Sequence, residues 1–117
     1  VLASGSRDRM IHVMDASKHY QLLTTLDDHS STITSINFTH ISRCLMLVSS
    51  SLDKSVLVRA YLDSSILSFK PVRAIVEKKS VMDFTIHPWS GLLALACQDK
   101  QVRVYGMLSS IEDNSFR

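Results

Sequence analysis

His29, Ser49 and Asp53 are the three residue types of a hydrolase triad, in which serine attacks, histidine moves the proton and aspartate orients the histidine. Such triads are recognised by geometry and not by spacing along the chain. Asp53 also suits a structural role, because an aspartate in a Leu-Asp-Lys turn accepts hydrogen bonds from nearby backbone amides. We therefore interpret the three residues as a structural hydrogen-bonded set and expect no catalytic residues.

The other residues that could do chemistry are scattered. No pair of histidines has the spacing of a metal site, no Cys-x-x-Cys motif occurs, and no glycine-rich segment could cradle a phosphate. We therefore expect no metal, no cofactor and no enzymatic activity. The histidines stand at positions 12, 19, 29, 40 and 87, and the glycines at positions 5, 91 and 106.

Length and composition limit the class of protein. The chain has 117 residues, 45% of them hydrophobic and 21% charged, which is typical of one globular domain. The longest uncharged apolar run, Cys44–Val48, is far shorter than the ~20 residues of a membrane-spanning helix. Two cysteines make no disulfide framework, so an intracellular setting is expected. A net charge of +2 is too near neutral to favour nucleic acid as a partner.

An internal repeat gives the strongest signal. A short apolar strand, an x-Asp-(Arg/Lys) turn and a strand of alternating character occur three times, around Asp8, Asp53 and Asp99. These aspartates are 45 and 46 residues apart. Phe38 and Phe84 also each stand 15 residues before an aspartate, and we take them as a second landmark of the repeat. A period of this length indicates a β-propeller or a similar array.

The middle unit shows the expected strands. Ile33–Phe38 and Ser55–Ala60 alternate apolar and polar residues, as strands with one buried face do. Cys44–Ser50 is apolar on both faces, as a central strand is. We expect Ile66–Phe69 to be a weaker outer strand. Four strands in each repeat are typical of one propeller blade. The fold class is therefore predicted as all-β, a partial propeller of about two and a half blades.

The repeat resembles the WD-repeat family, in which a Gly-His pair precedes the first strand of a blade and a Trp-Asp pair ends the third. Asp28-His29 stands at the Gly-His position in this sequence. Met14-Asp15, Arg59-Ala60 and Tyr105-Gly106 stand at the Trp-Asp positions. No repeat keeps the tryptophan, so the resemblance depends on the period and on the turn aspartates.

A closer resemblance covers almost the whole chain. The runs Val1–Asp15, Leu26–Thr34 and Ala96–Tyr105 are similar to the large WD-repeat scaffolds that bind mitogen-activated protein kinases, relatives of a c-Jun N-terminal kinase scaffold of spindle poles. Tyr61–Val81 matches less well. The resemblance implies a scaffold that works through protein contacts, in the cytoplasm and at centrosomes or spindle poles. It also implies a piece of a longer protein, whose kinase-docking segments would lie outside it.

The resemblance implies roles for the candidate residues. In the family, the histidine, a serine of the second strand and the turn aspartate are hydrogen-bonded, and the tryptophan donates to the serine. Leu95 replaces the serine in the third unit, so that set is expected to be broken. We expect the buried Arg59 to extend its charged end to solvent, or otherwise to pair with a carboxylate such as Asp63. The implied set is Ser4, Asp8, His29, Ser49, Asp53 and Asp99.

The three units divide the chain at predicted boundaries. Residues 1–27 are expected to be the end of one blade, residues 28–70 a complete blade, and residues 71–117 a third blade whose outer strand is doubtful. All three would be one segment of a propeller.

The candidate partner-binding face carries the second turn of each blade and the loops between blades. If Asp53 reaches His29, these turns and loops lie at the same end of the blade. Basic residues then outnumber acidic ones there, which favours either a solvated rim or an acidic protein partner. We predict a non-enzymatic protein-interaction scaffold; the alternatives are a tubulin- or nucleic-acid-binding module and, ranked lower, part of a propeller enzyme. The basic residues of the face are Arg7, Arg9, Lys54, Lys78, Lys79 and Lys100.

Overall fold

The computed structural model describes residues 1–41, 44–61, 69–87 and 90–106. This part of the chain is almost entirely β-strand. The one helix in it is a 3-10 turn at Ala16–Lys18, and no described helix is long and apolar enough to cross a membrane. The strands are β1 (Leu2–Gly5), β2 (Ile11–Asp15), β3 (Gln21–Leu26), β4 (Ile33–Ile41), β5 (Cys44–Ser51), β6 (Ser55–Tyr61), β7 (Phe69–Val76), β8 (Val81–Ile86), β9 (Leu92–Cys97) and β10 (Val102–Gly106).

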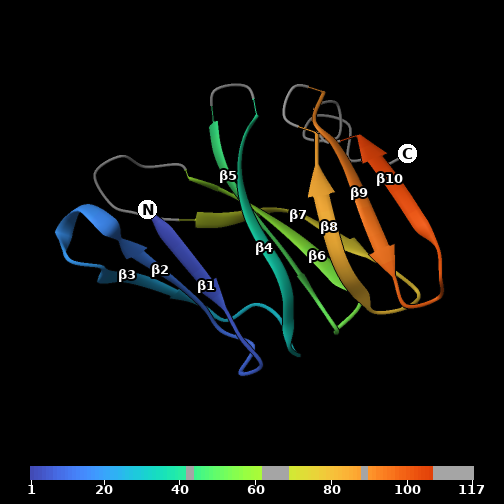
Figure 1. The fold of residues 1–117 in the computed structure, drawn as a ribbon, viewed down its shortest axis with the longest axis horizontal. Coiled ribbons are helices and arrows are strands. Elements are labelled where there is room, and N and C mark those ends of the chain that lie inside the picture. The colour runs from blue at the N-terminus through green and yellow to red at the C-terminus, as the bar shows by residue number, and fades with distance from the viewer. Residues whose placement is uncertain (42–43, 62–68, 88–89, 107–117) are drawn as a thin grey trace.

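The strands form three antiparallel sheets that stand side by side (Figure 1). The first sheet is β1-β2-β3, the middle sheet is β4-β5-β6-β7, and the third is β8-β9-β10. The all-β propeller fold class predicted from the sequence is confirmed. Each sheet is a meander of neighbouring strands, so every hydrogen-bonded pair is local in sequence.

The outer strand of the middle sheet is the main difference from the sequence prediction. It runs over Phe69–Val76 and pairs with β6, whereas Ile66–Phe69 was expected, and residues 62–68 lie outside the described residues. The middle sheet therefore continues past the boundary predicted at residue 70. Pro71 lies within this strand, where proline is tolerated because its missing N–H is not needed at a sheet edge.

The phenylalanine landmark was wrong. Phe38 lies opposite Leu47 on β5, whereas Phe84 lies opposite Leu95 on β9. Leu47 precedes its turn aspartate by six residues and Leu95 precedes its own by four, so the two phenylalanines occupy different positions in their sheets. The residue of β4 that matches Phe84 is Ile36, opposite Ser49. The hairpin of the first two strands is two residues longer in the middle sheet, as the pairs Ile36–Ser49 and Phe84–Leu95 show, and this difference made the two spacings agree by chance.

The core lies between the sheets. One cluster joins the first and middle sheets through Ile11, Val13, Ile33 and Leu47. A larger cluster joins the middle and third sheets and contains side chains of β5, β6, β8 and β9. Burying these side chains is the main favourable term that holds the sheets face to face.

Gly5 sets the closest approach between the first two sheets. A Cβ atom at this position would lie 2.6 Å from Cγ2 of Ile33 and 3.4 Å from Cγ2 of Ile36. The matching positions of the other sheets hold Ser50 and Ala96, which are also small. Strand β4 can therefore lie directly against β1 only because this position carries no side chain.

Candidate functional site

The three turn aspartates share one backbone role. Oδ1 of Asp8, Asp53 and Asp99 accepts the N–H two residues further on, at 3.0, 2.9 and 3.2 Å. The residue after each aspartate has a left-handed backbone, although none is glycine, and this conformation costs roughly 1–2 kcal/mol. The φ angles are 74° at Arg9, 73° at Lys54 and 65° at Lys100.

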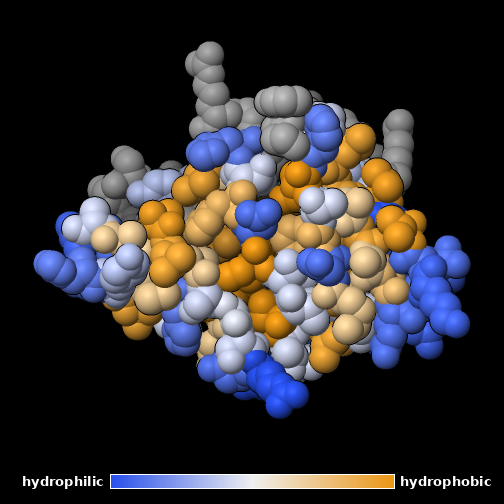
Figure 2. Space-filling view, in the orientation of Figure 1, coloured by the Kyte–Doolittle hydropathy of each residue, from blue (hydrophilic) through white to orange (hydrophobic). Residues whose placement is uncertain are grey.

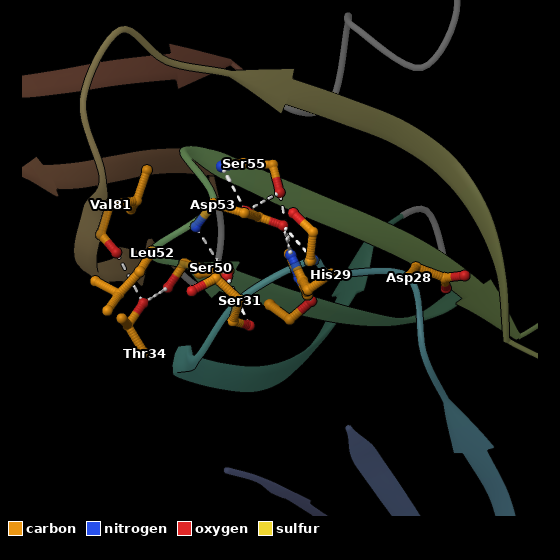
Figure 3. Close-up of polar contacts among 12 residues, drawn as sticks. Asp28, His29, Ser31, Thr34, Ser50, Leu52, Asp53, Ser55 and Val81 are labelled. Carbon is orange, nitrogen blue, oxygen red and sulfur yellow. Dashed lines mark hydrogen bonds and ion pairs between the residues drawn. The ribbon is translucent and has the colours of Figure 1, made fainter. Parts of the chain in front are cut away.

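In the middle sheet the turn is tied to a buried polar network (Figure 3). Nδ1 of His29 lies 3.1 Å from Oδ2 of Asp53, and its Nε2 lies 2.8 Å from Oγ of Ser49. Asp53 also accepts from the backbone N–H of Ser30 at 2.9 Å and from the hydroxyl of Ser55. The network thus joins the loop before β4 to β5 and to the β5–β6 turn.

The chemistry of the network fixes the direction of each hydrogen bond. Burial lowers the pKa of His29 although Asp53 opposes this, so the neutral imidazole is favoured. A carboxylate only accepts, so Nδ1 of His29 carries the proton toward Asp53 and Nε2 accepts from Ser49. Burial alone would raise the pKa of Asp53, but hydrogen bonds from Ser55, Ser30 and His29 together lower it. Asp53 therefore stays ionised.

Arg59 completes the network, which corrects the expectation that its charged end reaches solvent. Its side chain is fully buried. Nη1 donates to Oγ of Ser49 at 2.9 Å, while Nε and Nη2 donate to Oδ2 of Asp28 at 3.1 and 2.9 Å. Arg59 thus stands at the tryptophan position as a donor to Ser49. The pairing alternative was right in kind, but the partner is Asp28, and Asp63 lies outside the described residues.

These contacts argue against the triad interpretation on physical grounds. Ser49 is completely buried. Its oxygen accepts from Arg59 and its hydrogen is directed at His29, so no substrate carbonyl could approach it. Within the described residues there is also no group of three metal-binding side chains.

The third sheet lacks the serine-histidine set, as Leu95 led us to expect, and has a different network in its place. Arg103 donates to Oδ2 of Asp99 at 2.9 Å, and its Nε lies 3.7 Å from Oε1 of Glu77. The hydroxyl of Tyr105 donates to the same Glu77 oxygen at 2.6 Å. Glu77 is buried and follows β7 as His29 follows β3, four residues before the next sheet begins. It occupies the position of the histidine.

Burial and pairing with charged groups change the pKa values of residues in and beside this second network. The hydrogen bond from Arg103 lowers the pKa of Asp99. Burial, with the adjacent Glu77, raises the pKa of Tyr105 to about 12. Burial also raises the pKa of the Cys97 thiol. All three effects favour a fixed arrangement in which Asp99 is charged, and Tyr105 and Cys97 are protonated, at neutral pH.

The first sheet has neither network. Ser4 lies opposite His12 in the strand register, and Nδ1 of His12 lies 3.0 Å from Oγ1 of Thr25. Among the described residues no hydrogen bond joins Ser4 to Asp8. Of the candidate set, the structure therefore brings His29, Ser49 and Asp53 together. Ser4, Asp8 and Asp99 each lie apart from that group.

The turns that contain Asp8, Asp53 and Asp99, and the loops between sheets, lie along one edge of the molecule, the lower edge in Figure 1. Backbone hydrogen bonds connect them directly. The N–H of Leu52 donates to Thr32 at 3.0 Å, that of Glu77 to Lys54 at 2.7 Å, and that of Gln98 to Ser80 at 2.9 Å. We call this edge, with its cations Arg7, Arg9, Lys54, Lys78, Lys79 and Lys100, the basic edge.

All six cations of the basic edge are exposed. Figure 2 shows hydrophilic side chains gathered at the bottom and lower right, over the β1–β2 turn and the turns of the third sheet. Asp53 and Asp99 are held in the two networks, and Asp28 is paired with Arg59. Asp8 and Asp27 are the exposed acidic groups on this edge that form no ion pair within the described residues. The edge therefore has a clear positive excess.

Comparison with known proteins agrees with this geometry. The family "WD domain, G-beta repeat" matches residues 20–58. This segment is therefore similar to one WD repeat. It is 40% identical over 118 aligned residues to WD repeat-containing protein 62 of Sus scrofa, covering all of this chain and 8% of that protein. It is 35% identical to mitogen-activated protein kinase-binding protein 1 of Homo sapiens, again covering all of this chain and 8% of that protein.

The fold comparison gives the same architecture. The crystal structure of Saccharomyces cerevisiae Sqt1 superposes with a TM-score of 0.80 at 20% identity, over 98% of this chain and 30% of that one. WD-repeat propellers are generally non-catalytic interaction modules. At the tryptophan positions of such repeats this chain carries Met14, Arg59 and Tyr105.

Sequence reasoning missed three residues of the WD-repeat networks, namely Asp28, Glu77 and Arg103. Asp28 has no local signal for this role, because it stands next to His29 but 31 residues before Arg59. Glu77 stands 22 residues before its turn aspartate, whereas His29 stands 24 before its own. Alignment from the start of the first strand, instead of from the turn, would have placed Glu77 in the histidine position.

Proposed function

We propose that this chain is part of a non-enzymatic scaffold that binds an acidic protein segment along its basic edge. The observation that carries the proposal is the commitment of Asp28, Asp53 and Asp99 to internal pairs, which leaves six exposed cations facing solvent. A positive edge attracts a negative partner and raises its association rate.

The names of the relatives support a kinase-pathway setting. One of them is named as a mitogen-activated protein kinase-binding protein, and this chain spans 8% of its length. We propose the same pathway for the protein to which this segment belongs, with a place in the cytoplasm and at centrosomes or spindle poles. A tubulin tail is an acidic segment of the kind that the basic edge would accept.

The test is charge reversal with a matched control. Lys54→Glu and Lys100→Glu alter the basic edge, whereas Lys18→Glu makes the same charge change in the exposed β2–β3 connection. The probe is a fluorescent polyglutamate peptide, with duplex DNA of equal charge as a second arm. We expect each edge variant to slow peptide association several-fold at low salt and to reduce its salt dependence, and Lys18→Glu to have little effect.

Equal association rates for all three variants would contradict the proposal. Stronger binding of DNA than of the peptide, with a steep salt dependence, would favour a nucleic-acid module. Circular dichroism of each variant would show that any loss of binding is not a loss of fold.

A further inference from the structure

The outer strand of the middle sheet, β7, has one edge without a strand partner in the described part of the chain. The two faces of the middle sheet pack on the first and third sheets through the two core clusters. The edge of β7 therefore points outward between two covered faces, and it is not a face left open at either end of the array.

The register of β7 on β6 shows which backbone groups this edge presents. One step beyond the last paired residues, the N–H of Glu77 donates to the carbonyl of Lys54 at 2.7 Å. Hydrogen-bonded and non-hydrogen-bonded pairs alternate along an antiparallel ladder, so Ile75 is bonded to β6 while Ala74 and Val76 are not. The N–H and C=O groups of Ala74 and Val76 therefore point away from β6, and such groups are a template for pairing with another strand.

The side chains along this edge are mostly apolar, and several of them are open to solvent. Ile75 belongs to the larger core cluster and is 5% exposed, whereas Val76, on the opposite face of the strand, is 77% exposed. Ala74 and Val72 are exposed too. The charged residue of this stretch, Arg73, lies on the same face as Ile75. The edge thus offers exposed apolar side chains beside its free backbone groups.

Cations lie at the end of β7 that follows Val76. Lys78 and Lys79 are two and three residues further along the chain, and Lys54 is held there by its hydrogen bond with Glu77. All three lysines are exposed members of the basic edge. Glu77 does not neutralise them, because it is buried in the network of the third sheet. The free edge of β7 and the basic edge are therefore continuous.

We infer that the acidic segment binds in an extended conformation, as a fifth strand paired antiparallel with β7. The inference rests on the proposed function, because the partner is the same acidic segment. Every described strand pair is antiparallel, and this pairing is the more stable kind per residue. The partner residues opposite Ala74 and Val76 would each exchange two hydrogen bonds with β7.

The same pairing sets which residues the partner needs. Side chains directly opposite Ala74 and Val76 would lie on the same face as these two, so β-branched apolar residues fit there. Strand β7 runs toward Lys78 and Lys79, so an antiparallel segment begins beside those lysines. Its acidic residues should therefore precede its apolar ones. Pro71 has no N–H to donate, so the pairing should end before it.

The test compares fluorescent peptides, with the affinity measured by anisotropy. The parent peptide is a run of glutamates followed by Val-Thr-Val-Thr-Val, and a second peptide has the reverse order. N-methylation of the valines removes the N–H groups directed at β7. N-methylation of the threonines removes the N–H groups directed away from it and is the matched control. In the protein, Ala74→Pro removes an outward N–H without removing a bond to β6, and Ala74→Val keeps that N–H.

Strand pairing has a specific signature in this series. We expect the N-methylvaline and reversed peptides to bind about tenfold more weakly than the parent peptide, and the N-methylthreonine peptide to bind as the parent does. Ala74→Pro should weaken binding of the parent peptide about fivefold, and Ala74→Val should have little effect. Circular dichroism verifies the fold of both variants. If Ala74→Pro unfolds, the peptide series still decides, because it uses the wild-type chain.

Equal binding of the two N-methylated peptides would overturn the inference. If Lys54→Glu still weakened binding of every peptide, the proposed function would stand and only the strand pairing would fail. If Lys54→Glu changed the affinity of none of them, the proposed function would fail and the inference with it. Tighter binding of the reversed peptide would overturn the antiparallel arrangement, and no measurable binding of the parent peptide would overturn the inference as a whole.

Discussion

The middle and third sheets both connect the aspartate of a turn to the strand that follows it, but they do so with different chemistry. In the middle sheet Arg59 donates to the hydroxyl of Ser49. That hydroxyl donates to the neutral imidazole of His29, which in turn donates to Asp53. In the third sheet Arg103 contacts Asp99 directly and reaches Glu77, which Tyr105 holds from the other side. One network is a relay of polar groups and the other is a chain of ion pairs.

The difference shows what the tryptophan position of a WD repeat requires. Neither network contains a tryptophan, yet Arg59 and Tyr105 both present a donor from the tryptophan position to a buried acceptor. The middle sheet adds a charge that must be neutralised inside the protein, and Asp28 does so. The third sheet places its arginine elsewhere, with its side chain 29% exposed, so water shares in its solvation. The middle network should therefore be the more sensitive to loss of one partner.

The largest expected effect comes from Asp28→Ala. Arg59 would stay fully buried without its counterion, and removing one partner of a buried pair typically costs 3–5 kcal/mol. Asp28 is 43% exposed, so we expect the low end, about 3 kcal/mol, in the free energy of unfolding by urea. The double variant Asp28→Ala with Arg59→Trp should regain most of that loss. If the double variant is as unstable as Asp28→Ala, the buried charge is not the cause.

His29→Ala and Asp53→Ala should each cost about 1–3 kcal/mol, because each leaves a polar group of the network without its partner. The double variant should cost less than the sum, since the two residues share one network. Urea unfolding of the two single variants and the double variant measures the coupling. Strict additivity would mean that the two side chains do not interact.

Tyr105→Phe should have a smaller effect in the third sheet, about 1 kcal/mol. Glu77 would lose its 2.6 Å hydrogen bond but would still have Arg103 at 3.7 Å. The matched control is Tyr20→Phe, because Tyr20 is 60% exposed and should tolerate the change. A loss larger than that of His29→Ala would reverse the ranking of the two networks.

Acid should destabilise the middle network first and only gradually. The pKa of His29 is lowered in the folded protein, so between pH 7 and 5 the unfolded chain takes up a proton that the folded chain resists. Stability should fall as the pH drops through this range, by less than ~1.4 kcal/mol per pH unit for one group. His29→Gln should flatten the dependence in urea titrations at fixed pH. A slope unchanged in His29→Gln would assign it to other groups.

Much of the fold could be predicted from the sequence, because turns and central strands carry local signals. The spacing of Asp8, Asp53 and Asp99 located three hairpins, and each aspartate bonds the backbone of its own turn. Cys44–Ser50 was predicted as a central strand from its apolar character, and the strand ends one residue later. These features depend on residues close together in the chain.

The rest depended on contacts that the sequence does not display. Arg59 and Asp28 are 31 residues apart, and nothing in the local pattern pairs them. Glu77 was hidden because the first hairpin of the third sheet is shorter, which changes its spacing from Asp99 by two residues. The outer strand was predicted at Ile66–Phe69 but runs over Phe69–Val76, because its pairing with β6 is not displayed by the local pattern.

Gly5 has a consequence for the curvature of the array. Alanine there would put a carbon atom 2.6 Å from Cγ2 of Ile33, so either the Ile33 side chain or the sheet that carries it would have to move away. The angle between successive sheets decides how many of them complete a circle. In this protein a single added methyl group would therefore change how two sheets pack on each other, although it would change neither a charge nor a hydrogen bond.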